Sequence, residues 1–296
     1  MNRDVHYIHR QRGMALFQVL LLTAVIAVLA IQFTQTAKNQ VSIASTLGNR
    51  VQAGVDMRTA ESQLLFALLT EQRYQHNAES LPIVNQWNFY GKPFSVNEKV
   101  EYVIQDQNGL IGLFRAKDTS LLASGFGAIG VQQPQTLAAG IIDWQDADSN
   151  INLGGAEQGQ YASPGKPSNF PFQTYQEIAH VNGLFGKNWY DIRPFVSIRP
   201  QTYINPKLAP KELLALHLPA EQVAKVVELR ENNQLTDSFF SSLTGLTTDE
   251  GVFFSASGLL RVSIKVKSDD VVFTNKLEFK VQPYDRHPFI EYEKTI

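Results

Sequence analysis

The sequence contains no cysteine among its 296 residues. This absence excludes disulfide bonds, thiolate catalysis and zinc held by sulfur ligands. The sequence also lacks an excess of one charge, since 26 basic and 28 acidic residues give a formal net charge of −2. A chain without a basic excess has no electrostatic footprint for nucleic acid, so we expect no nucleic-acid partner.

Recognisable catalytic motifs are also absent. The six histidines are scattered, and neither a two-histidine metal spacing nor a nucleophile elbow occurs. Gly125, Gly127 and Gly130 spell a G-x-G-x-x-G, but no βαβ pattern surrounds them, so we interpret them as a helix that ends in a turn. We therefore expect that the protein is not an enzyme.

Charged side chains are missing from residues 14–37. An apolar stretch of this length can span a bilayer as a helix. Arg3, Arg10 and Arg12 precede it, and a positively charged flank stays in the cytoplasm. The sequence thus predicts a single-pass protein of the inner membrane, with a cytoplasmic N-terminus and periplasmic C-terminal domains.

The helical pattern continues beyond the membrane segment. No proline occurs before Pro82, although Gly48 and Gly54 weaken the helix locally. We predict that residues 38–80 form the periplasmic part of the same helix. Apolar residues at helical spacing mark one face of it: Val41, Ala44, Leu47, Val51 and Val55. On this N-terminal segment alone, a plain signal anchor followed by a coiled-coil stem is an alternative.

Two regions far apart in the chain have the alternation of β-strands. Residues 100–104 and 110–114 flank an Asn-Gly turn sequence, which predicts a β-hairpin. Residues 251–254, 259–266 and 271–281 predict antiparallel strands with one buried face. The side chains expected on that face are Val262, Ile264, Val266, Val272, Leu277, Phe279 and Val281.

The region between these strands is mainly helical and loop-rich. Asn205 can cap a helix that Pro206 starts, or Pro210 can open a helix, and Pro219 opens the next one.

The predicted fold class is therefore α+β. A long N-terminal helix packs on a small antiparallel sheet, and residues 81–118 and 251–296 form this lobe. A large α-helical domain, residues 119–250, is inserted between the strands.

Oxygen-bearing side chains recur at alternate positions in one loop. The candidate metal ligands are Asp146, Asp148, Asn150, Asn152 and Glu157. They repeat the spacing of the EF-hand ligands, and hard oxygen donors suit calcium. An EF-hand needs glycine where this sequence has Ile151, so we do not predict an EF-hand. A solvated acidic turn, in which Asp146 or Asp148 caps a helix, is the alternative.

The N-terminal segment resembles a prepilin leader. Residues 11–16 read Gln-Arg-Gly-Met-Ala-Leu, which is similar to the junction that a prepilin peptidase cleaves and methylates. The resemblance implies a leader of residues 1–13, cleavage between Gly13 and Met14, and N-methylation of Met14. Prepilins usually have glutamate at the fifth mature position, where it neutralises the N-terminus of a neighbouring subunit in the membrane. This sequence has Gln18 there.

Further motifs resemble the K-type minor pseudopilins of type II secretion systems, which are known for lacking that glutamate. Residues 143–157 begin Asp-Trp-x-Asp-x-Asp and end Gly-Gly-Ala-Glu, with Tyr161 nearby. Residues 205–210 have the family's Asn-x-x-x-Ala-Pro pattern. The family usually has another acid where this sequence has Gln158, which puts one ligand of the family's site in doubt.

The resemblance implies a pilin-like fold, a SAM-like or helix-hairpin-helix-like segment at about residues 203–245, and a structural calcium ion in the inserted domain. It implies a minor pseudopilin that initiates or caps the tip of the periplasmic pseudopilus. Expected partners are the I-type and J-type minor pseudopilins, the H type, the major pseudopilin, the prepilin peptidase and the inner-membrane assembly platform. A minor pilin of a type IV pilus or competence system is the main alternative. A membrane-anchored periplasmic calcium-binding protein is another.

Overall fold

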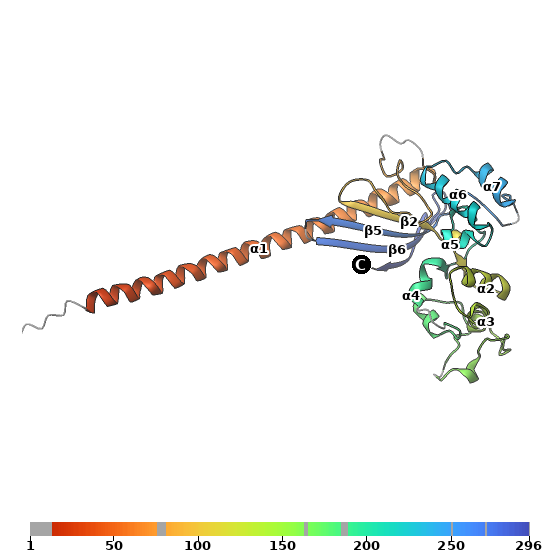
Figure 1. The fold of residues 1–296 in the computed structure, drawn as a ribbon, viewed down its shortest axis with the longest axis horizontal. Helices are drawn as coiled ribbons and strands as arrows, with labels where there is room; N and C mark the ends of the chain where they lie inside the picture. The colour runs from red at the N-terminus through yellow and green to blue at the C-terminus, as the bar shows by residue number, and fades with distance from the viewer. Residues whose placement is uncertain are drawn as a thin grey trace, which may run out of the picture.

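A long helix projects from a headpiece that consists of a sheet and a helical domain (Figure 1). The computed structural model describes residues 14–75, 81–162, 165–184, 189–249, 251–269 and 271–295. The inserted helices gather at the end of the sheet that is farthest from the free half of the long helix (Figure 1).

The long helix, α1, runs from Met14 to Thr70 without a break. Its 57 residues correspond to a length of about 85 Å. The prediction that this helix continues to residue 80 is wrong. Arg73 Nε donates to the Ala256 carbonyl oxygen (3.3 Å), and the Trp87 indole N–H donates to the Tyr74 carbonyl oxygen (3.0 Å). These long-range bonds draw the backbone away from the helical path and override local propensity.

The sheet is antiparallel and has five strands in the order β1-β2-β5-β6-β7. The strands are β1 (Phe94–Ser95), β2 (Val100–Asp106), β5 (Leu259–Ser268), β6 (Val271–Val281) and β7 (Phe289–Thr295). The second half of α1 covers one face, where Leu64 and Leu68 join a core with Val262, Ile264 and Val266. The predicted α+β architecture is confirmed, because early and late segments of the chain share this sheet.

The predicted hairpin of residues 100–104 and 110–114 is wrong. Gln107–Gly109 forms a 3-10 turn, and β3 (Ile111–Gly112) pairs in parallel with β4 (Val196–Ser197) instead of with β2. Asp106 explains the change of direction. Its buried carboxylate accepts hydrogen bonds from the Asn108 amide (2.9 Å) and from Ser257 Oγ (2.5 Å), so the chain turns into the inserted domain rather than back along β2.

Two details of the C-terminal strands also differ from the prediction. The register pairs Val266 with Phe273 and Val262 with Leu277, so odd-numbered residues of β6 face α1. Val272 therefore points away from the core and is 51% exposed. Residues 251–254 form no strand, and Val252 makes only an isolated bridge with Ile204. β1 and β7 are strands that the sequence did not predict.

The inserted domain is helical, as predicted, and connects β2 to β5. Its helices are α2 (Thr119–Ala128), α3 (Pro134–Gln145), α4 (Trp189–Ile192), α5 (Lys211–Leu214), α6 (Ala220–Glu231) and α7 (Asp237–Thr244), with 3-10 helices η2 (Gln158–Gln160), η3 (Tyr175–His180), η4 (Arg193–Phe195) and η5 (Pro206–Leu208). Both predicted helix starts occur, since η5 follows Asn205 and α5 follows Pro210. Gly125 and Gly127 lie in α2 and Gly130 in the turn after it, so the interpretation as a helix and turn is confirmed.

A buried ionic cluster fastens the inserted domain to the second face of the sheet. Glu278 on β6 is 2% exposed. It accepts hydrogen bonds from its cross-strand neighbour Arg261 (Nε to Oε1, 2.8 Å) and from Arg199 of the inserted domain (Nε to Oε2, 3.2 Å). Arg261 also donates to the Tyr175 hydroxyl (2.6 Å) and the Val196 carbonyl oxygen (2.9 Å). Burial alone would lower the pKa of Arg261, but Tyr175 and Glu278 raise it.

Candidate functional site

The N-terminal half of α1 has no cover from the rest of the chain. From Met14 to Gln52 no side chain is buried, and Ala53 is the first buried residue of the helix. An 18-residue window of α1 has a mean hydropathy of 2.7, and none of that window is buried. Among the residues that the structure describes, α1 is the one helix long and apolar enough to cross a membrane. This agrees with the predicted single-pass anchor.

The predicted processing site lies at the start of this helix. Met14 is the first residue of α1, and both Met14 and Gln18 are exposed. Residues 1–13, including Gly13, lie outside the described part of the chain. Cleavage before Met14, its methylation and the filament role of Gln18 therefore stay predictions.

The second candidate site is an acidic cluster in the inserted domain. Asp143 lies in the last turn of α3, Asp146 caps its C-terminus, and Glu157 precedes η2. One carboxylate oxygen from each of the three residues lies within 4.8 Å of the other two. Three carboxylates at this separation form a group of oxygen ligands that can hold a divalent cation.

Local packing fixes the position of Asp143. The loop returns over it so closely that a Cβ added at Gly155 would lie 1.9 Å from Asp143 Oδ2. Asn152 donates its backbone N–H (3.3 Å) and its side-chain amide to the same carboxylate. The neighbouring Trp144 is buried, and its ring stacks on Phe172 at 6.2 Å between centroids. The cluster is thus held by the core of the inserted domain.

Two carboxylate oxygens of the cluster are buried without a hydrogen-bond partner, Asp146 Oδ1 and Glu157 Oε1. An unpaired buried oxygen is costly unless a cation or a proton compensates for it. Burial and the neighbouring Asp148 and Asp143 raise the pKa of Asp146. Burial, followed by Asp146, Asp143 and Asp148, raises the pKa of Glu157. Both shifts indicate a site short of positive charge.

The structure brings together two of the five predicted ligands, Asp146 and Glu157. Asp148 is exposed and is not one of the three clustered carboxylates. Its carboxylate accepts a hydrogen bond from the backbone N–H of Asn150, which is also exposed (2.8 Å). Asn152 contacts Asp143 through its amide rather than through an oxygen. The predicted ligand set lacks Asp143, although its place three residues before Asp146 puts both on one side of a helix end.

The raised pKa values predict how stability depends on pH when no metal is present. The folded state binds protons at Asp146 and Glu157 more tightly than the unfolded state. The two ionised carboxylates therefore destabilise the folded protein, and this effect is complete above their folded pKa values. It disappears as the pH falls through the carboxyl range. The measurement compares the melting temperature of the parent with that of an Asp146→Asn/Glu157→Gln double variant, both in EDTA. As the pH is lowered from about 7.5 to about 5, we expect the melting temperature of the parent to rise relative to that of the variant. A constant difference between the two melting curves would contradict this prediction.

Comparisons with known proteins agree on one family. Residues 119–201, which include the acidic cluster, match the family model described as type II secretion system (T2SS), protein K. A curated relative, the type II secretion system protein K of Klebsiella pneumoniae, is 28% identical over 207 residues. This match covers 64% of the present chain and 63% of the relative, so the chain spans less than two thirds of that relative's length.

One similar solved structure belongs to the GspK-GspI-GspJ complex of the type 2 secretion system of enterotoxigenic Escherichia coli. The match has a TM-score of 0.51 and 14% sequence identity, and it covers 85% of this chain and 98% of that chain. At this identity the match shows the fold. The predicted resemblance to the K-type pseudopilins is confirmed.

Proposed function

We propose that the protein is a minor pseudopilin that initiates or caps the tip of the periplasmic pseudopilus in type II protein secretion. The bare half of α1 is the observation that carries this proposal. Between Met14 and Gln52 the helix exposes large apolar side chains, such as Val41 at 70% and Leu47 at 61%. Apolar surface of this extent needs lipid or other apolar helices around it.

A tip position agrees with two features of the chain. Gln18 is neutral, so it cannot neutralise the charged N-terminus of a neighbouring subunit in the membrane. The inserted domain also widens the headpiece beyond the end of α1 (Figure 1), which leaves little room for another subunit above it. In this arrangement the N-terminus is cytoplasmic, α1 crosses the inner membrane, and the headpiece is periplasmic.

The proposed partners are other pseudopilins. The solved structure with the similar fold is a complex of GspK with GspI and GspJ, so we assign the I-type and J-type minor pseudopilins as neighbours. The H type and the major pseudopilin would follow along the filament. The prepilin peptidase would process the chain, and the inner-membrane assembly platform would receive it.

The absence of cysteine provides a direct test by single-cysteine cross-linking in cells. Val41→Cys places a thiol on the bare half of α1, whereas Leu121→Cys places one on the equally exposed surface of α2 (65% exposed). We expect Val41→Cys to cross-link to other pseudopilins and Leu121→Cys not to do so. In the same cells, mass spectrometry should find an N-methylated Met14. An uncut chain without pilin-like adducts would contradict the proposed function.

We also propose that the acidic cluster binds a structural calcium ion. The two buried oxygens without partners support it, as does the convergence of Asp143, Asp146 and Glu157 within 4.8 Å. A bound cation would offset the mutual repulsion of these carboxylates and stabilise the inserted domain. Asp148, Asn150 and Asn152 remain candidates for the outer positions of the site.

A further inference from the structure

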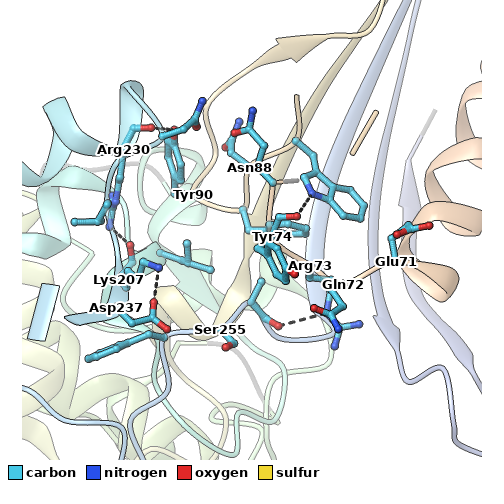
Figure 2. A pocket seen from close by; sticks show the side chains of 18 of the residues that line it. Glu71, Gln72, Arg73, Tyr74, Asn88, Tyr90, Lys207, Arg230, Asp237 and Ser255 are labelled. Atoms are coloured by element: carbon cyan, nitrogen blue, oxygen red, sulfur yellow. Dashed lines mark hydrogen bonds and ion pairs between the residues drawn. The ribbon is translucent and has the colours of Figure 1, made fainter. Parts of the chain in front are cut away.

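A cavity of about 850 Å³ opens between the end of α1 and the second half of the inserted domain. Residues 69–75 and 87–90 form one wall, and the other is formed by Lys207, Arg230, Asn233 and residues 235–237. Figure 2 shows Arg73 and Gln72 on one side of the cavity and Arg230, Lys207 and Asp237 on the other. Its volume lies within the range of protein ligand sites, which is about 300–1,000 Å³.

The cations on the far wall already have partners. Lys207 forms an ion pair with Asp237 (2.5 Å). Arg230 is buried, donates to the Ala209 carbonyl oxygen (2.8 Å), and lies 5.2 Å from the centroid of the Tyr90 ring. Figure 2 shows these pairs as separate contacts on that wall. Lys207 is therefore neutralised by Asp237. Arg230 forms no ion pair among the described residues and its Nε has no hydrogen-bond partner, but the residue is only 6% exposed and presents little surface to a ligand.

Arg73 differs from these two cations. Its guanidinium donates through Nε to the Ala256 carbonyl oxygen (3.3 Å), and no carboxylate of the described residues forms an ion pair with it. Burial lowers the pKa of Arg73, and Tyr203 and Asp106 offset only part of that effect. Its remaining N–H donors have the planar arrangement that binds a carboxylate through two hydrogen bonds.

Aromatic rings also line the cavity. Tyr74, Trp87, Tyr90, Phe254 and Tyr284 line the cavity, and Tyr284 on the β6–β7 connection is fully exposed at its rim. Rings of this kind bind apolar and aromatic side chains with little loss of conformational entropy. The side-chain amide of Asn233 lies in the same lining and can bond to a peptide backbone.

We propose that this cavity binds an acidic peptide segment of a partner protein. One carboxylate of the peptide pairs with Arg73, and an adjacent apolar or aromatic side chain packs against the rings. Charge complementarity carries the assignment, because the three cations of the lining outnumber its two carboxylates, Glu71 and Asp237. The Lys207–Asp237 pair is neutral as a unit and Arg230 is buried, so Arg73, which is half-buried, is the cation that a ligand can reach. The proposal concerns the headpiece and does not depend on pseudopilus assembly.

The test uses the full chain in detergent micelles and two dipeptide probes, N-acetyl-Glu-Phe-amide and N-acetyl-Gln-Phe-amide. Binding is followed by tryptophan fluorescence, since Trp87 lines the cavity, and by calorimetry. We expect saturable binding of the Glu probe that is at least about tenfold tighter than that of the Gln probe, because hydrogen bonds to charged groups are the stronger ones. Arg73→Gln should abolish this preference. Arg58→Gln, on the exposed side of α1, should retain it.

Equal affinity for the two probes would overturn the proposal, as would a preference that survives Arg73→Gln. If Arg73→Gln does not fold, Asn233→Asp gives a second test. A carboxylate at this lining position repels the Glu probe but not the Gln probe, so the preference should fall by a similar factor. An unchanged preference in Asn233→Asp would then refute peptide binding at this cavity.

Discussion

Glu278→Ala is expected to lower the free energy of unfolding by about 3–5 kcal/mol, because removing one partner of a buried ion pair leaves the other charge uncompensated. Glu278 is 2% exposed and is the carboxylate between Arg261 and Arg199. Without it, two guanidinium groups face each other next to Tyr175. The inserted domain should then detach from the sheet more readily.

Urea unfolding of the full chain in micelles, followed by circular dichroism, measures this effect. Glu291→Ala is the matched control, since Glu291 is an exposed carboxylate on the adjacent strand β7. We expect the control to change the unfolding free energy by no more than about 0.5 kcal/mol. Similar losses in the two variants would mean that the cluster around Glu278 contributes nothing specific.

Calcium is expected to stabilise the inserted domain by about 4 kcal/mol at a concentration about a thousandfold above its dissociation constant. Gly155→Ala should abolish this stabilisation, because the added methyl group would lie 1.9 Å from Asp143 Oδ2 and displace a proposed ligand. The rise in melting temperature on adding calcium, measured by calorimetry at neutral pH, reports the effect.

Gly159→Ala is the matched control for the calcium experiment. Gly159 lies in the same loop region, and nothing lies within 4 Å of a Cβ added there. This variant should keep the full response to calcium. A parent protein that does not respond, or a Gly155→Ala variant that responds as the parent does, would exclude a calcium site at the acidic cluster.

Local periodicity was sufficient to predict the elements that depend on short-range sequence. The uncharged run and the apolar spacing predicted α1, and alternation predicted β5 and β6. Prolines at helix starts predicted η5, α5 and α6. The predicted hairpin and the predicted end of α1 were wrong, because hydrogen bonds between distant residues, Asp106 to Ser257 and Arg73 to Ala256, decide the path of the chain there.

The candidate sites were predictable only in part for the same reason. The ligand spacing indicated Asp146 and Glu157, but Asp143 joins them through the return of the loop over Gly155. Arg261 and Glu278 become partners only through the register of β5 and β6. The cavity beside Arg73 combines segments from both ends of the chain and from the inserted domain, so no local pattern could have indicated it.

The placement of the inserted domain has a consequence for the order of folding. β2 must pair with β5, and the hydrogen bond that closes this connection joins residues 151 positions apart. The strands β5, β6 and β7 are neighbours in sequence and can associate as a local meander, whereas closing the long connection costs more chain entropy. While the chain is being synthesised, β2 can pair with the short strand β1 but must wait for its other partner, β5, until the whole helical domain has followed. An early collapse of that domain shortens the effective loop and brings β2 to its partner.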